Sequence, residues 1–347
     1  MAGHILIYGA YGYTGELIAR QAVATGLTPV LAGRDADKLA PLARELDLPH
    51  VAVSVTDTDG LHKALDGCAA VLNCAGPFIE TWKPMTDACL ATGTHYLDIT
   101  GEVDVLSGCA GRDADAKAAG ITLMPGTGFD VVPTDCLSAM LADRLPDATR
   151  LTLAFKGMSQ ASRGTATTAI SYLGRAPIIR RDGALRGRTG PLFRKVDFGD
   201  GPEEVGAISW GDTVTAWHTT GIPNIEVFMK PPADMVALMK LPLALRRLLT
   251  GIGRPLIQRR LDAMPPGPDE EARRTGHCTI WGRVENAEGQ SAELRLRTTE
   301  GYRLTSITAP LIAARAAAGE LPTGFRTPAG ALGADFILGI DGCDMLS

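Results

Sequence analysis

Short apolar runs and segments of helical periodicity follow one another from the first residues to Leu145. Each run has the length of a buried strand, and each following segment carries apolar residues three or four positions apart. The runs that predict strands are Ile5–Tyr8, Pro29–Ala32, His50–Val55, Ala70–Gly76, Thr94–Thr100 and Ile121–Met124. The segments that predict helices are Glu16–Val23, Ala36–Leu46, Asp59–Leu65, Met85–Ala91 and Val132–Leu145. This alternation predicts a doubly wound parallel sheet.

Beyond Leu145 the pattern changes to alternating stretches separated by glycine and proline turns. The strand-like stretches are Leu151–Phe155, Val205–Trp210, Thr213–His218, Ile225–Met229, Cys278–Glu285 and Ala292–Thr298. They predict an antiparallel or mixed sheet in a second domain. Helices are expected at Ala166–Leu173 and Tyr302–Ala318, a helical turn from Thr327, and a last strand at Phe336–Ile340.

The segment Pro232–Leu261 is mostly helical in pattern and both apolar and basic, with arginines at 246, 247, 259 and 260. Such a segment can lie on a membrane or contact an apolar substrate. A buried or subunit-contacting helix with a basic outer face explains the same pattern, and we favour that interpretation from the sequence.

A glycine-rich turn joins the first predicted strand to the first helix. Its spacing is G-x-x-G-x-x-G, a variant of the dinucleotide-binding fingerprint, in the strand–turn–helix context that the fingerprint needs. Glycines let the backbone approach a pyrophosphate, and the helix N-terminus supplies N–H donors and a positive dipole. The expected cofactor-binding residues are therefore Gly9, Tyr11, Gly12, Tyr13, Thr14 and Gly15.

The end of the second strand indicates which dinucleotide binds. An NAD site usually places a carboxylate there for the ribose 2′-hydroxyl, whereas this chain has Gly33 followed by Arg34. A small residue leaves room for a 2′-phosphate and an arginine can pair with it. NADP(H) is therefore the expected cofactor, and Asp35 is interpreted as the N-cap of the following helix.

Later strand exits supply further candidates, because ligands of such sheets collect beyond the carboxyl ends of the strands. Asn73, Ala75, Gly76, Pro77 and Gly101 are expected to line the cofactor. Carboxylates near such exits are acid/base candidates, and Glu102 and Asp130 are our candidates for the proton path or for substrate orientation. Glu102 as a helix cap and Asp98 as a buried hydrogen-bonded acid are the structural alternatives. Substrate contacts are expected at Phe129 and, in the polar loop 159–165, at Arg163 and Thr165.

The fold class that these features predict is α/β, a Rossmann-type doubly wound parallel sheet with an inserted second α/β domain. Residues 1–135 and 321–347 are expected to form the NADP-binding domain, and residues 136–320 the substrate and oligomerisation domain. The helix start at Pro328-Ala329-Gly330 motivates the return of the chain to the first domain.

Composition excludes several other classes of protein. The net charge of −5 over 347 residues argues against nucleic-acid binding. Seven cysteines without a C-x-x-C pair favour free thiols and no metal site. No uncharged apolar run reaches about 18 residues, so no transmembrane helix is expected. No signal peptide is visible, and a cytoplasmic homodimer is expected.

The sequence lacks the residue patterns that two other dehydrogenase mechanisms need. None of the six tyrosines has a lysine four positions later, so the Tyr-x-x-x-Lys mechanism is disfavoured. Cys136 lies early on a predicted helix, where a thiol pKa can fall, but no base is paired with it in the sequence. We interpret it as a small buried residue.

With these residues in view, the chain resembles the saccharopine dehydrogenase-like oxidoreductases, a group that includes saccharopine reductases and trans-acting enoyl reductases. The resemblance rests on residues 8–15, 32–34, 73–78, 96–102, 125–130 and 327–331, and it is weaker between Arg180 and Arg274. It implies an NADP-binding Rossmann domain with an inserted α/β domain. The tract 80–84 departs from the glycine-containing stretch expected after Gly-Pro-Phe, which leaves the substrate open.

The function expected is hydride transfer from NADPH to the C=C bond of a small, polyketide-like or lipid-like substrate, free or carrier-linked. Reduction of a C=N bond in an amino-acid-type substrate is the first alternative. A non-catalytic NADP-binding regulator or lipid-associated scaffold is the second, because it would share every phosphate-binding feature.

Overall fold

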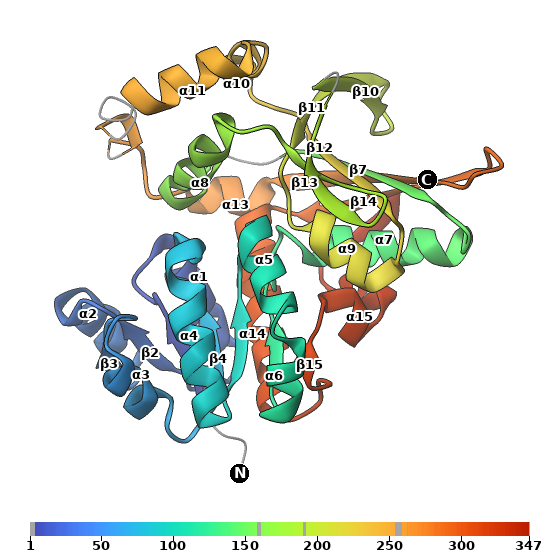
Figure 1. The fold of residues 1–347 in the computed structure, drawn as a ribbon. Helices are drawn as coiled ribbons and strands as arrows, with labels where there is room; N and C mark the ends of the chain where they lie inside the picture. The colour runs from blue at the N-terminus through green and yellow to red at the C-terminus, as the bar shows by residue number, and fades with distance from the viewer. Residues whose placement is uncertain (1–3, 158–160, 190–191, 254–258, 262, 347) are drawn as a thin grey trace. The chain divides into compact units, whose positions relative to one another are not determined.

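The computed structural model describes residues 4–157, 161–189, 192–253, 259–261 and 263–346. The chain divides into two units (Figure 1). The first unit comprises Met1–Val132 and Tyr302–Gly333, and the second comprises Pro133–Gly301 and Ala334–Ser347. Within the described residues no helix is long and apolar enough to cross a membrane.

The first unit contains a seven-stranded sheet, counted over the described residues, in the order β15-β6-β5-β4-β1-β2-β3. All its strand pairs are parallel. The strands are β1 (His4–Tyr8), β2 (Val30–Gly33), β3 (His50–Ala52), β4 (Cys68–Asn73), β5 (His95–Asp98), β6 (Thr122–Met124) and β15 (Gly324–Phe325). This is the doubly wound order with one added edge strand, and its switch point lies between β1 and β4.

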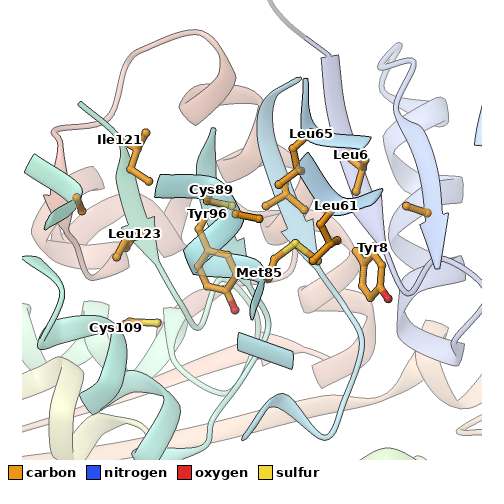
Figure 2. Close-up of a cluster of buried hydrophobic side chains, with 14 of the residues drawn as sticks. Leu6, Tyr8, Leu61, Leu65, Met85, Cys89, Tyr96, Cys109, Ile121 and Leu123 are labelled. Carbon is orange, nitrogen blue, oxygen red and sulfur yellow. The ribbon is translucent and has the colours of Figure 1, made fainter. Parts of the chain in front are cut away.

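Helices connect these strands in sequence. They are α1 (Tyr13–Ala24), α2 (Ala36–Leu46), α3 (Thr58–Leu65), α4 (Phe78–Thr92), α5 (Val103–Ala110), α6 (Asp113–Ala118), α14 (Gly301–Ala317) and α15 (Pro328–Leu332). Figure 2 shows the apolar cluster that strand side chains form with α3, α4 and α5, and Tyr96 lies within it. Leu6 and Tyr8 belong to this cluster, while Ile5 and Ile7, which alternate with them along β1, are also buried. Both faces of the sheet are therefore covered, which explains why its strands are continuous apolar runs.

The second unit contains a mixed sheet of nine described strands. The main path is β10 (Phe193–Asp197), β11 (Pro202–Ile208), β12 (Asn224–Met229), β7 (Arg150–Lys156), β13 (His277–Glu285), β14 (Ser291–Thr299) and β16 (Asp344–Leu346). Off this path, β8 (Ile178–Arg181) pairs with β12 and with β9 (Ala184–Gly187). Only the β7–β12 pair is parallel among the described strands. The expected α/β fold with a second, mixed sheet is confirmed.

The helices of this unit are α7 (Val132–Arg144), α8 (Arg163–Leu173), α9 (Asp212–Thr220), α10 (Ala233–Met239), α11 (Leu243–Ile252) and α13 (Glu270–Thr275). One expectation is wrong here, because Thr213–His218 lies in α9 and is not a strand. Its β-branched residues suggested a strand. Residues 212–216 are all buried, however, and the helix ends at Gly221 in the left-handed conformation. Strand propensity reflects fit to a pleated surface, and packing overrides it.

The end of the chain differs from the expected arrangement. Phe336–Ile340, expected as a strand that returns to the first domain, lies instead in the 3-10 helix η1 (Ala334–Gly339) and its exit, and this segment belongs to the second unit. The following strand β16 pairs with β14. Helix α14, expected in the second domain, belongs to the first unit. A five-residue apolar run has no period that separates a strand from a helix, so only tertiary contacts decided its form.

Candidate cofactor and active site

The turn between β1 and α1 is built so closely that only glycine fits at two positions. Gly9 has φ +79°, and a Cβ there would lie 2.8 Å from the Ala75 nitrogen of the loop after β4. A Cβ on Gly15 would lie 2.3 Å from the Gly9 carbonyl oxygen. The turn therefore contacts the neighbouring strand exit at the switch point, where a dinucleotide binds in sheets of this kind.

The N-terminus of α1 has the character of an anion-binding end. Gly12 is its N-cap, and no side chain caps the first turn. Gly12 donates its own N–H to Gly9, 3.0 Å away, which closes the turn. A helix start without a side-chain cap leaves backbone donors for a phosphate group. Tyr11, Tyr13 and Thr14 flank this end as partly exposed residues.

The exit of β2 has the features expected of a 2′-phosphate site. The ring of Tyr11 lies over Gly33, where a Cβ would come within 2.6 Å of it. Asp35 caps α2 by accepting the N–H of Lys38 at 3.2 Å, as the sequence predicts. Its carboxylate is therefore engaged in the helix cap. Arg34 is exposed and makes no hydrogen bond or ion pair with the residues that the structure describes. Its guanidinium is thus available for an anionic group.

The exit of β4 is held by a side-chain network. Asn73 is fully buried and donates to Thr81 Oγ1 at 3.1 Å, while its Oδ1 accepts the N–H of Ala75 at 3.1 Å. Thr81 in turn donates to the Ala75 carbonyl at 2.8 Å. Asn73 therefore shapes the loop from within, and Gly76 and Pro77, which follow, are exposed.

The exits of β5 and β6 are joined by Asp98, which is fully buried. Its carboxylate accepts hydrogen bonds from the Tyr96 hydroxyl at 2.7 Å and from the N–H groups of Thr100 and Gly126, each at 2.9 Å. Burial is the main cause that raises its pKa to about 6, and the three hydrogen bonds oppose that rise. Asp98 is thus the buried hydrogen-bonded acid of the structural alternative.

Glu102 caps a helix, although not the one expected. The sequence suggests a cap for the helix that follows it, but its two carboxylate oxygens accept the N–H groups of Phe78 and Ile79 at 3.2 and 3.0 Å. These are the first residues of α4, where a negative charge is favoured by the helix dipole. Glu102 therefore fixes the loop after β4 from the exit of β5.

Asp130 is the carboxylate at these exits that is free of such a structural bond. It is half-buried, and it makes no hydrogen bond with the residues that the structure describes. Its carboxylate lies against Gly101, where a Cβ would come within 2.9 Å of Oδ2. Burial and, less strongly, the nearby Glu102 raise the pKa of Asp130 to about 7. A carboxyl group of this kind holds a proton near neutral pH and can give it up.

Two residues of α14 hold the turn that carries Asp130. Thr305 Oγ1 accepts the Phe129 N–H at 2.9 Å, and Thr308 donates to the Thr127 carbonyl at 2.8 Å. Tyr302 packs edge-on against Tyr13 of the glycine turn, with ring centroids 5.3 Å apart. Sequence reasoning missed Thr81, Thr305 and Tyr302, because no spacing connects them to residues that are distant in the chain.

The residues expected to contact the substrate are divided between the two units. Phe129 is 4% exposed, so its ring belongs to the interior of the first unit. Arg163 and Thr165 lie in the first turn of α8 in the second unit, where Ser162 accepts the Thr165 N–H at 3.2 Å. Ser159 and Gln160 of that predicted loop lie outside the described residues. A role of any of these residues in substrate binding stays a prediction.

Comparisons with known proteins agree with this geometry. Residues 5–124 match the family model of the saccharopine dehydrogenase NADP binding domain. A probable mitochondrial saccharopine dehydrogenase-like oxidoreductase of Arabidopsis thaliana is 30% identical over 148 residues. A trans-acting enoyl reductase of Mycobacterium leprae is 30% identical over 139 residues. Each match covers 38% of this chain and 33% of the relative. The chain thus spans about a third of the length of these relatives.

The fold of the whole chain is similar to that of a solved enzyme. The apo, histidine-tagged saccharopine dehydrogenase (L-Glu forming) of Saccharomyces cerevisiae aligns over 99% of this chain and 100% of its own, with a TM-score of 0.64 and 13% identity. At that identity the likeness shows the fold alone. The resemblance and the cofactor expected from the sequence are both confirmed: residues 5–124 match the model of the saccharopine dehydrogenase NADP binding domain, and the chain as a whole has the fold of that enzyme.

Proposed function

We propose that this protein is an NADP(H)-dependent oxidoreductase that reduces a carbon–carbon double bond. The observation that carries the proposal is the pairing of an NADP-binding turn with a protonatable carboxyl group, Asp130, at the exit of β6 in the same unit. Reduction of a double bond needs one hydride and one proton. A bound NADPH supplies the hydride, so the protein has to supply the proton and hold both partners in place.

In this proposal, different residues of the first unit bind the cofactor, donate the proton and position the loops. The backbone of residues 9–15 would hold the pyrophosphate, and Arg34 would pair with the 2′-phosphate. Gly76, Pro77 and Gly101 would lie along the cofactor beyond β4 and β5. Asp130 would hold the proton that saturates the second carbon. Asp98 and Glu102 would contribute indirectly, because they position the loops around Asp130.

The charges at the strand exits support a neutral acceptor. Residues 73–78, 98–102 and 125–130 contain three carboxylates and no lysine or arginine. A substrate with several carboxylates would be repelled there, whereas an amino-acid imine of the saccharopine type would need arginines. One feature favours the second candidate, imine reduction, because Asp130 beside Glu102 would stabilise a protonated imine. The carboxylate groups of such a substrate would then have to bind elsewhere, with Arg163 as our candidate.

The experiment that separates these candidates follows the fluorescence of NADPH with two acceptor panels. One panel holds enoyl thioesters, free and carrier-linked, and the other holds mixtures of α-keto acids with amino acids. We expect NADPH oxidation with the enoyl panel and its loss in Asp130→Asn. Oxidation with the imine panel alone would favour the second candidate. Tight NADPH binding without turnover of either panel would favour the non-catalytic regulator or lipid-associated scaffold.

The homodimer and the cytoplasmic location expected from the sequence belong to the same proposal. Light scattering coupled to size exclusion tests the dimer, and fractionation of the native host tests the compartment. A monomer, or recovery of the protein in another compartment, would contradict these two points and leave the proposed reaction unchanged.

A further inference from the structure

Helix α11 of the second unit exposes its leucines and buries an arginine. Leu245, Leu248 and Leu249 are 40%, 53% and 43% exposed, while Arg246 between them is 5% exposed. Residues at i, i+3 and i+4 lie on one face of a helix. The ordinary polarity of a surface helix is therefore reversed, since arginine is rarely buried and leucine is usually inside.

The opposite side of α11 is held by α8 and the turn that follows it. Arg247 Nε donates to the Gly174 carbonyl at 3.2 Å. A Cβ on Gly174 would lie 2.7 Å from Thr250 Oγ1, which shows how close the helix comes to this turn. These contacts fix the orientation of α11. The leucine face is thus presented outward by the fold itself.

The sequence around this helix is basic, although Lys240 is paired with Glu204 of β11 at 3.1 Å. Between Asp234 and Asp262 the sequence has no acidic residue, and its basic residues are Lys240, Arg246, Arg247, Arg254, Arg259 and Arg260. The chain as a whole carries a net charge of −5. Arg259 and Arg260 are exposed, and their side chains make no hydrogen bond or ion pair with the described part of the chain. A basic segment with exposed, unpaired arginine side chains on an acidic protein indicates an anionic partner.

We propose that the leucine face of α11 docks on an anionic lipid surface. A short helix can lie in the plane of a bilayer interface, with its leucines among the acyl chains and neighbouring arginines at the lipid phosphates. A clustered apolar face marks a protein or membrane contact. A two-fold contact with a second copy is disfavoured, because it would bring the basic segment that contains α11 against its own copy.

This surface is independent of the proposed reaction, so vesicle binding tests it directly. The full chain is floated with vesicles of phosphatidylglycerol and phosphatidylcholine, and with phosphatidylcholine vesicles alone. We expect binding to the anionic vesicles, weakened by high salt. We expect Leu248→Glu to lower the partition coefficient by about tenfold or more, and Arg259→Gln with Arg260→Gln to lower it less.

The matched control is Leu311→Glu on α14, where the leucine is 41% exposed. It should bind vesicles like the unmodified protein, and NADPH affinity should be unchanged in every variant as evidence of folding. Failure of the unmodified chain to bind the anionic vesicles would overturn the proposal. Equal losses in Leu248→Glu and Leu311→Glu would also overturn it. A dimer that Leu248→Glu dissociates, without vesicle binding, would show instead that this face joins two copies.

Discussion

Four acidic residues near the strand exits of the first unit have different tasks, and their neighbours decide which. Asp35 and Glu102 are helix caps that accept backbone N–H groups. Asp98 is enclosed by three donors. Asp130 makes no such bond with the described residues and has its pKa raised to about 7 by burial and by Glu102. The residue type alone therefore does not separate a structural carboxylate from a candidate proton donor. The number of hydrogen-bond donors around each carboxylate does.

Arg34→Ala should weaken NADPH binding by about tenfold to a hundredfold, because it removes the charge-assisted pair that we propose between Arg34 and the 2′-phosphate. NADH affinity should stay the same, since NADH has no phosphate there. Arg44→Ala, an exposed arginine further along α2, is the control. Calorimetric titration of both cofactors measures the effect, and an equal loss for NADH and NADPH would contradict the assignment.

Asp130→Asn should lower turnover by about a hundredfold to ten-thousandfold, as for loss of a general acid. A proton donor works in its protonated form, so turnover of the unmodified protein should fall as pH rises through about 7. The variant should lack this fall. Asp104→Asn, an exposed residue of α5, serves as the control. A pH profile with the same alkaline limb in the variant would show that another group titrates.

Asp98 should make the folded state less stable as pH rises. Its folded pKa of about 6 lies above the ordinary value of 3.8, so the folded state holds the proton more tightly. The stability that this proton contributes is present below about pH 4 and is lost between about pH 4 and 6, by an amount of about 3 kcal/mol. Urea unfolding of the unmodified protein and Asp98→Asn measures it. The difference between their unfolding free energies should change over that range, and parallel curves would contradict the prediction.

At the scale of elements, the strand exits are connected by bonds between distant segments. The β5 exit holds the start of α4 through Glu102 and holds the β6 exit through Asp98. Helix α14, more than a hundred and seventy residues along the chain from Phe129, holds the turn of Asp130 through Thr305. The strand-exit loops are thus held to one another by hydrogen bonds between segments that are distant in the sequence.

Glu102→Ala should lower the unfolding free energy by about 1–3 kcal/mol, because it leaves the first N–H groups of α4 without their acceptor. Glu102→Gln should recover part of the loss, since an amide oxygen still accepts one bond. Glu80→Ala is the control, because Glu80 is an exposed acid in the first turn of the same helix. Urea unfolding measures all three, and equal effects of Glu80→Ala and Glu102→Ala would contradict the capping role.

At the scale of the molecule, the chain crosses between its units more often than the sequence indicates. It leaves the first unit after Val132, returns at Tyr302 and leaves again after Gly333. Strand β16 therefore completes the sheet of the second unit by pairing with β14. An exposed ion pair between Arg297 and Asp344 accompanies this pairing and contributes little.

A chain that ends at Cys343 should keep its affinity for NADPH within about twofold, because β16 belongs to the second unit. Its unfolding free energy should fall by about 1–3 kcal/mol through the lost pairing of Arg295, Leu296 and Arg297 with the tail. Cofactor titration and thermal unfolding check the two statements. A large loss of NADPH affinity would indicate that the tail supports the first unit instead.

The sequence by itself determined β1 to β6 of the first unit's sheet, the glycine turn and the identity of the cofactor, but not the edge strand β15. These features are local, because apolar runs, helix caps and the Gly33-Arg34 pair act within a few residues. Only the tertiary structure decided that Thr213–His218 is a helix, that the tail joins the second sheet, and that Asp130 is the carboxylate free of a structural bond. Those outcomes depend on which residues, distant in the sequence, supply packing contacts and N–H donors. Local sequence patterns do not indicate such contacts.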